Sequence, residues 1–305
     1  AIALMRGLIA QDPQDAEQHW DHALQLLAAG DLRGGFQEYE WRFKRASWRT
    51  SLPPNLRVWR GETDPKLRLL VAAEQGLGDA IQFLRFIPLA RERVGKLIVA
   101  VQRTLLPVAK SILGAEGVYA MDEAMPGVDA AVDMLSLPSL LGTTLDTLPV
   151  AVPYLAASAE GLARWRARLG ERGQAQPGYI NPGQSSPNLF DQAPSARPRV
   201  GLVWGGNPEV KNDRVRSPGL ATVLPLLVRT DIDWYVVQMG PAREALKDSP
   251  LPAHVHDLAP QIESFDDTAA ILALMDVTLT SDTSVAHLAG AMGLDTWVMV
   301  PWIHD

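Results

Sequence analysis

The chain has 305 residues, of which 47% are hydrophobic and 21% charged, the balance of a globular protein with one large domain or two ordinary ones. Its formal net charge of −7 argues against a broad nucleic-acid surface. The absence of cysteine excludes disulfides, thiolate metal sites and cysteine nucleophiles, and it suits the cytoplasm. No apolar run is long enough to span a bilayer, so no transmembrane segment is expected. Because Ala1 opens inside a helical pattern and Asp305 follows a strand-like run, we expect a piece of a longer protein.

Residues 1–46 are predicted to be helices. One helix ends before Asp12-Pro13, a second ends at Gly30, and Asp31 is placed to cap a third. This pattern resembles one tetratricopeptide repeat (TPR) with the tail of another, a unit that needs stacked neighbours and can bind a protein partner.

Residues 47–66 form a predicted connecting segment. Across its border, Trp41, Trp48 and Trp59 lie among several arginines. Such a mixture suits single-stranded nucleic acid, or else the tryptophans dock the helices on the next domain while the arginines stay solvated. The acidic whole favours docking, and no nucleic-acid partner is expected.

From residue 67 the pattern changes to apolar strands alternating with amphipathic helices. The alternation predicts an α/β fold with two Rossmann-like, doubly wound domains behind the helical segment. The predicted domains are residues 67–170, closed by a helix near 160–169, and residues 199–305. A Gly-, Pro- and Ser-rich linker at 171–198 joins them, and a ligand cleft is expected between the two halves.

The first candidate loop reads EQGLGD, residues 74–79. Gly76 and Gly78 allow a ligand to approach the backbone closely, and a helix is predicted to begin near Asp79. Two roles fit Asp79: an N-cap of that helix, or a general base that takes a proton from an acceptor hydroxyl. The spacing is not Gly-x-Gly-x-x-Gly, which disfavours a nicotinamide-dependent oxidoreductase.

The second candidate loop follows the predicted strand that ends at Trp204. Polar residues crowd ahead of Ser217-Pro218, which is predicted to be an N-cap and first helical residue. Cations and an amide beside a helix start would complement a diphosphate, although a solvated charged loop also fits. The candidate donor-binding residues here are Lys211, Asn212, Arg214, Arg216 and Ser217.

The third candidate loop joins the predicted strand VTLTS to a helix predicted over 285–292. Hydroxyl and backbone groups of Thr283 and Ser284, next to a helix start, can bind an anion. His287 falls in the first turn, where a polar core role and a ligand-binding role both fit. No metal-ligating pattern is found, and Asp266-Asp267 is expected to cap a later helix.

Together the three loops resemble a known group. EQGLGDAIQFLRFIPLA, GLVWGGNPEVKNDRVRS and DTSVAHLAGAMG are similar to bacterial TPR proteins with a C-terminal domain of the ADP-heptose heptosyltransferase family, glycosyltransferase family nine. The resemblance implies the GT-B fold and inverting, metal-independent transfer. It implies Asp79 as the base, an acceptor loop of Gln75, Gly76 and Gly78, and donor contacts from Asp282, Thr283, Ser284 and His287.

The resemblance therefore predicts a glycosyltransferase that takes a nucleoside-diphosphate sugar as co-substrate, without a further cofactor, and a protein, glycan or lipid as acceptor. The alternative is a TPR interaction scaffold whose transferase-like domain does not catalyse, because fold alone does not determine function.

Overall fold

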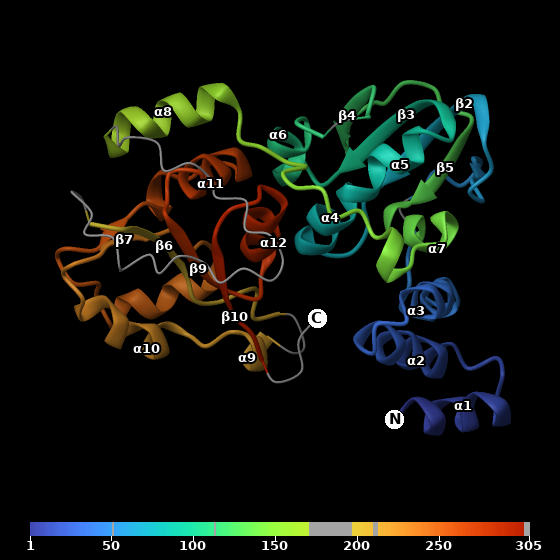
Figure 1. Ribbon diagram of the computed structural model, residues 1–305, viewed down its shortest axis with the longest axis horizontal. Helices are drawn as coiled ribbons and strands as arrows, with labels where there is room; N and C mark the ends of the chain where they lie inside the picture. Colours follow the sequence, from blue (N-terminus) through green and yellow to red (C-terminus); the bar gives the residue numbers. More distant parts are fainter. Residues whose placement is uncertain (51, 113, 171–196, 210–212, 302–305) are drawn as a thin grey trace. The chain divides into compact units, whose positions relative to one another are not determined.

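The computed structural model describes residues 1–50, 52–112, 114–170, 197–209 and 213–301. They form two compact units, residues 1–151 and the residues from Val152 onward. Each unit contains one five-stranded parallel sheet (Figure 1). The expected pair of parallel α/β domains is thereby confirmed, whereas most of the expected linker at 171–198 lies outside the described residues. None of the helices in the described ranges is long and apolar enough to cross a membrane.

The first unit begins with the helices expected from the sequence. The Asp15 carboxylate caps the second helix by accepting the N–H groups of Glu17 and Gln18, and Asp31 caps the third through Gly34. Apolar residues of the second and third helices pack against each other to form a hairpin. The elements are α1 (Ile2–Gln11), α2 (Ala16–Ala28), α3 (Leu32–Tyr39) and a 3₁₀ turn (Glu40–Lys44).

The first sheet has the strand order β1-β5-β2-β3-β4. From β2 the chain steps outward to β3 and β4, and then returns to place β5 on the other side of β2. The direction of winding thus reverses between β2 and β5, which end level with each other because Ala72 pairs with Asp133. The strands are β1 (Arg57–Val58), β2 (Asp64–Ala72), β3 (Val94–Val101), β4 (Gly117–Ala120) and β5 (Ala130–Asp133).

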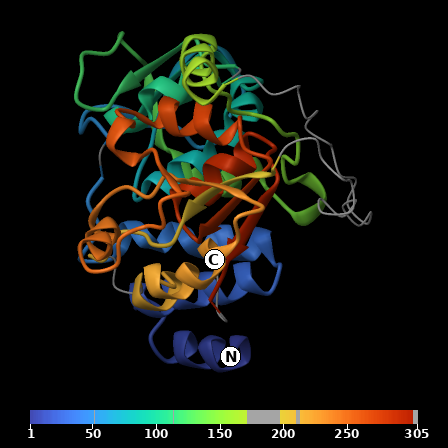
Figure 2. The ribbon, with the colours of Figure 1, turned by 90° about the vertical axis from the view of Figure 1, so that its left-hand side faces the viewer.

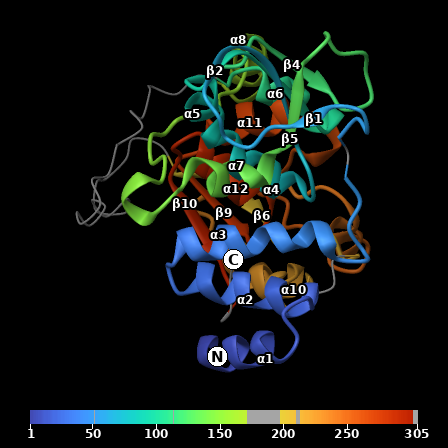
Figure 3. The ribbon, with the colours of Figure 1, turned by 90° about the vertical axis from the view of Figure 1, so that its right-hand side faces the viewer.

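Short helices complete this unit. The helix expected to begin near Asp79 begins at Leu77, with Gly76 as its N-cap. The helix α3 contacts α7, which follows the end of β5 (Figures 1 and 3). The helices are α4 (Leu77–Phe83), α5 (Ile87–Arg91), α6 (Leu106–Ala109) and α7 (Leu137–Leu141), with 3₁₀ turns at Leu84–Phe86, Arg103–Leu105, Met134–Ser136 and Leu145–Thr147.

The second sheet has the same kind of topology, with the strand order β10-β9-β6-β7-β8. Here the winding reverses between β6 and β9. All five residues of β6 are buried, and Trp204, which follows it, is fully buried in an apolar cluster with Leu202 and Val236. The strands are β6 (Arg199–Val203), β7 (Asp233–Val236), β8 (His256–Asp257), β9 (Val277–Ser281) and β10 (Thr296–Met299).

The helices of the second unit are α8 (Ala159–Leu169), α9 (Asp213–Arg216), α10 (Leu220–Val223), α11 (Phe265–Leu272) and α12 (Ser284–Ala291), with 3₁₀ turns at Leu224–Val228, Pro241–Lys247 and Ala259–Gln261. The helix α8 packs along α11 (Figures 1 and 2). The expectation that it closes the first half is wrong, because α11 supplies its polar partners. Asp267 accepts the indole N–H of Trp165 at 2.8 Å, and Asp266 accepts the N–H of Ser158 at 2.7 Å.

The start of the helix expected to be capped by Asp266-Asp267 also lies earlier than predicted. Ser264 is the N-cap of α11, and Asp267 is the third helical residue, whose carboxylate accepts the Ser264 N–H at 3.1 Å. The reciprocal pair is a capping box, which satisfies two otherwise unpaired backbone donors.

Candidate functional site

In open parallel sheets, ligands bind outside the carboxyl ends of the strands where the direction of winding reverses. In the first unit this place lies between β2 and β5, where residues 74–79 and 133–136 follow the strand ends. In the second unit it lies between β6 and β9, where residues 204–209, 213–217 and 282–287 follow. Topology therefore brings every described candidate residue to one of these two edges.

At the first edge the loop is organised around Gly76. Its N–H donates to Asp79 Oδ2 at 2.9 Å, so Asp79 reaches back to the N-cap residue instead of being the N-cap itself. Gln75 and Gly76 are exposed, while Gly78 and Asp79 are half-buried. The acceptor-loop residues are thus gathered at this edge, and the role of Asp79 as a base stays a prediction.

A buried ion pair supports this loop, and the sequence did not reveal it. Arg42, from the 3₁₀ turn after α3, is 0% exposed, which corrects the expectation that the arginines of this segment stay solvated. Its Nη2 lies 2.8 Å from Glu74 Oε1 and 2.7 Å from Ser136 Oγ. The guanidinium also lies over the rings of Phe43 and Trp48, at 4.1 and 5.4 Å from their centroids. Charged hydrogen bonds and aromatic faces together compensate its burial.

A second buried carboxyl, Asp133, lies at the end of β5 and is 3% exposed. Within the described residues its Oδ1 has no hydrogen-bond partner. Burial raises the pKa of Asp133 to about 7, and the negative charge of Glu74 adds to this shift while Arg42 opposes it. Asp133 is thus a group that exchanges a proton near neutral pH at the same edge as Asp79.

This shift makes a prediction about stability. The pKa of Asp133 is higher in the folded state than the ordinary value of 3.8, so its stabilising contribution is present below about pH 4 and is lost as the pH rises towards 7. We expect Asp133→Asn to raise the free energy of unfolding more at pH 8 than at pH 5, by on the order of 2 kcal/mol. Urea denaturation at both values measures this difference.

Asp129→Asn is the matched control, because Arg68 holds the pKa of Asp129 down to about 2 and that carboxylate stays ionised over the same range. Its effect should be the same at pH 5 and pH 8. Equal effects of Asp133→Asn at the two pH values would show that Asp133 does not titrate there.

At the second edge, Gly206 marks the place where the other two loops meet. A Cβ built on Gly206 would lie 2.8 Å from Asp213 Oδ1, 3.3 Å from Arg216 Nη2 and 3.3 Å from Thr283 Cγ2. The loop after β6, the helix α9 and the loop after β9 therefore converge on one glycine backbone. A cation, its paired carboxylate and a hydroxyl-bearing residue therefore lie together there. Arg216 supplies the positive charge that an anion site requires, while Asp213 is the nearest carboxylate to it.

Ser217 takes part in this arrangement, but not as the predicted N-cap. Its Oγ accepts the Gly206 N–H at 2.9 Å and donates to Asp213 Oδ1 at 2.8 Å. The helix expected to start at Pro218 starts at Leu220, with Gly219 as N-cap. Ser217 is instead the residue after α9, and it fastens that helix to the loop after β6.

Gln238, at the end of β7, was not predicted from the sequence. Its amide oxygen accepts the N–H groups of Trp204 and Gly205 at 2.8 and 2.9 Å, and its amide nitrogen donates to Gly205 O at 2.9 Å. The side chain is 1% exposed. Gln238 therefore holds the turn that leads to Gly206.

The third loop begins α12 one residue earlier than predicted. Thr283 is the N-cap of a helix that runs from Ser284, and Thr283 is buried while Ser284 and His287 are half-buried. Asp282 is also half-buried. Just before them, Ser281 is fully buried, and its Oγ has no hydrogen-bond partner in the described part of the chain.

The candidate cations of the second loop differ in their burial. Arg216 is half-buried, with its Nε 3.5 Å from Asp213 Oδ1, whereas Arg214 is exposed. Lys211 and Asn212 lie outside the described residues. Among the described side chains, no group of three or more His, Asp or Glu residues is placed to hold a metal ion.

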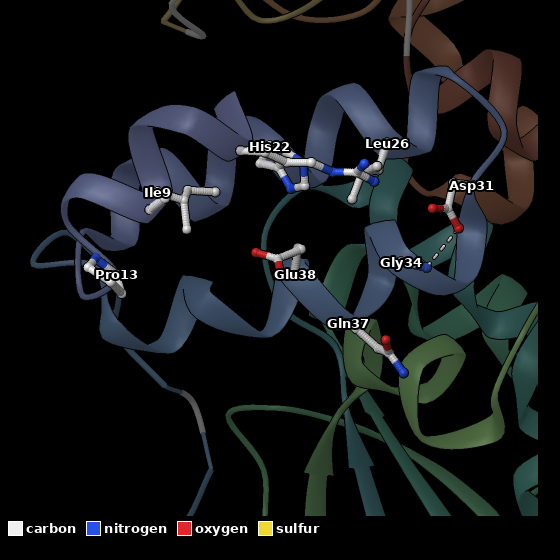
Figure 4. A pocket seen from close by; sticks show the side chains of 10 residues that line it. Ile9, Pro13, His22, Leu26, Asp31, Gly34, Gln37 and Glu38 are labelled. Carbon is white, nitrogen blue, oxygen red and sulfur yellow. Dashed lines mark hydrogen bonds between the residues drawn. The ribbon is translucent and has the colours of Figure 1, made fainter. Parts of the chain in front are cut away.

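A separate groove of about 470 Å³ lies in the helical segment (Figure 4). His22 and Leu26 of α2 line it opposite Glu38 of α3. His22 is 5% exposed, and neither of its ring nitrogens has a hydrogen-bond partner among the described residues. The groove contains none of the predicted site residues.

Comparisons with known proteins bear on the fold. No protein-family profile matches the chain. It is 26% identical over 318 aligned positions to Protein FlbA of Caulobacter vibrioides, covering 94% of this chain and 48% of that protein. The chain thus spans about half the length of the curated relative that it matches.

Two of the solved structures that are similar to it illustrate the fold. One is ADP-heptose lipopolysaccharide heptosyltransferase II of E. coli, with a TM-score of 0.50 and 11% identity over 76% of this chain and 84% of that one. The other is a family 9 glycosyltransferase of Veillonella parvula, with a TM-score of 0.53 and 10% identity over 78% and 82%. The chain has a heptosyltransferase-like fold. At this identity the likeness extends to the fold and not to the chemistry.

Proposed function

We propose that the protein is an inverting, metal-independent glycosyltransferase that takes its sugar from a nucleoside-diphosphate donor. The observation that carries the proposal is the convergence on Gly206 of Arg216 and Thr283. A diphosphate needs positive charge and unpaired N–H donors, and Arg216 with the start of α12 supplies both. The heptosyltransferase-like fold adds support, because one similar structure is named for ADP-heptose.

In the proposed reaction, an acceptor hydroxyl oxygen attacks the anomeric carbon of the sugar and its proton passes to the Asp79 carboxylate. The bond from the anomeric carbon to the diphosphate oxygen breaks, and its electron pair leaves with the nucleoside diphosphate. Arg216, Thr283 and the backbone of Ser284 stabilise the charge that develops on this leaving group. Asp282 and His287, beside them at the same edge, are the remaining proposed donor contacts.

The acceptor is proposed to be a protein, a glycan or a lipid that meets the loop of Gln75, Gly76 and Gly78. Three carboxyl groups, those of Glu74, Asp79 and Asp133, lie close to the ends of β2 and β5, and Arg42 is paired with Glu74. A hydroxyl donor suits such an edge better than a phosphate does, because carboxylates repel a second anion.

The second candidate function is a binding scaffold, and the groove in α1–α3 favours it. The imidazole of His22, which lines this groove with Glu38 and has no hydrogen-bond partner among the described residues, offers hydrogen bonds to a polypeptide backbone. In this proposal the helices are a TPR unit that binds a protein partner while the sheets bind a nucleotide without turnover. A soluble protein of the cytoplasm is proposed in both cases.

Donor binding is the first test. Calorimetric titration with UDP-, GDP- and ADP-sugars should give saturable binding for one nucleotide, and Arg216→Met should weaken it by about tenfold or more through loss of a charged contact. The control Arg229→Met removes an arginine that is paired with Asp231 just before the start of β7, and this variant should bind as the unaltered protein does. Binding of NAD in place of any nucleotide-sugar would refute the proposal.

Turnover is the second test. Asp79→Asn preserves the size of the side chain but removes the proton acceptor, so transfer should slow on the order of a hundredfold while calorimetric donor affinity stays unchanged. The release of nucleoside diphosphate from the donor that binds measures this rate. If Asp79→Asn leaves the rate unchanged, Asp79 is not the base. If the unaltered protein binds the donor but releases nothing, the scaffold function is favoured.

A further inference from the structure

The loop that bears Asp79 is fastened residue by residue to the segment just after α3. Glu74 is held by Arg42, through Nε at 3.3 Å from Oε2 and Nη2 at 2.8 Å from Oε1, and it also accepts the N–H of Leu135 at 3.0 Å. Both partners are buried, with Arg42 0% and Glu74 7% exposed. The start of the loop is therefore fixed on both sides.

The next residue, Gln75, has a left-handed backbone with a φ of 60°, which is uncommon and unfavourable for a residue other than glycine. Its amide nitrogen donates to the Tyr39 hydroxyl at 2.9 Å, and the hydroxyl donates back towards the amide oxygen at 3.2 Å. Gln102 Nε2 adds a bond to the Gln75 carbonyl at 3.3 Å. These contacts hold Gln75 in a conformation that it would otherwise leave.

The left-handed turn at Gln75 sets the direction of the next peptide, whose N–H at Gly76 donates to Asp79 Oδ2 at 2.9 Å. Tyr39 is 8% exposed, and burial raises the pKa of its phenol, so the hydroxyl stays protonated. A neutral hydroxyl can both accept from and donate to the Gln75 amide. An unbroken series of contacts thus runs from Tyr39 through Gln75 and Gly76 to Asp79.

We propose that Tyr39 is a positioning residue for Asp79, so that the helical segment completes the acceptor side of the site. The catalytic part of this inference rests on the proposed function, whereas the geometric part does not. The Tyr39 hydroxyl fixes Gln75, Gln75 directs the Gly76 N–H, and the Gly76 N–H orients one oxygen of Asp79. With one oxygen fixed, the Asp79 carboxylate keeps one orientation, which a general base requires.

Tyr39→Phe tests this most directly, because it removes one oxygen atom and preserves the ring that packs on Trp20. Hydrogen exchange of the full chain, followed by mass spectrometry, should show the Gly76 amide exchanging at least about tenfold faster, while amides of β2 and β3 are unchanged. Tyr119→Phe, on β4 of the same unit, is the matched control and should leave Gly76 exchange unchanged. Unchanged exchange in Tyr39→Phe would overturn the proposal.

The kinetic readout separates positioning from mere stability. With the nucleotide-sugar that binds in calorimetry as the probe, Tyr39→Phe should lower kcat for nucleotide release about tenfold and leave donor affinity unchanged. In a Gln75→Gly background, where a positive φ needs no support, the same substitution should have little further effect on kcat. A full further loss there would overturn the proposal. If the unaltered protein binds no nucleotide-sugar, the proposed function fails. The exchange of the Gly76 amide in Tyr39→Phe still decides whether Tyr39 positions the loop.

Discussion

The buried guanidinium of Arg42 is the constraint around which the first unit is arranged. A charge without water needs several acceptors, and Arg42 obtains them from the chain near it, from Glu74 after β2 and from Ser136 after β5. Removing one partner of such a pair typically costs about 3–5 kcal/mol. The Arg42 side chain therefore contacts all three of these parts of the first unit: the segment after α3, the loop of Asp79 and the end of β5.

This constraint acts at the place where the sheet topology already directs a ligand. Winding reverses between β2 and β5 in one unit and between β6 and β9 in the other, and the two edges differ in chemistry. The first gathers the carboxyl groups of Glu74, Asp79 and Asp133, whereas the second gathers Arg216 and the start of α12. The proposed division into a proton-accepting edge and a diphosphate-binding edge rests on Asp79 at the first and on Arg216, which is paired with Asp213, at the second.

The sequence predicted the parallel sheets well, because continuous apolar strands alternating with helices permit little else. The sequence did not predict contacts between side chains that lie far apart along the chain. Arg42 was expected to be solvated because its partners lie 32 and 94 residues away in the sequence. Asp133 was not singled out, because its burial depends on neighbouring elements.

Local patterns also misled at the helix starts. Ser217 is a residue type that often caps helices, but its oxygen accepts the Gly206 N–H. The next helix begins two residues later than predicted, with Gly219 as its N-cap. Asp79 likewise serves as the third residue of a helix that Gly76 begins. Gln238 had no local signal at all, because its contacts with Trp204 and Gly205 depend on the pairing of β6 with β7.

The central claim is that a nucleoside diphosphate binds the edge of the second sheet and leaves the edge of the first free for an acceptor. Hydrogen exchange of the full chain with and without saturating ADP, UDP or GDP tests it most directly. Protection of the amides in the first turn of α12, which have no side-chain cap, with Gly76 and Asp79 unchanged, is the predicted result. Protection at Gly76 and Asp79 instead, or at neither edge with any of the three nucleotides, would contradict it.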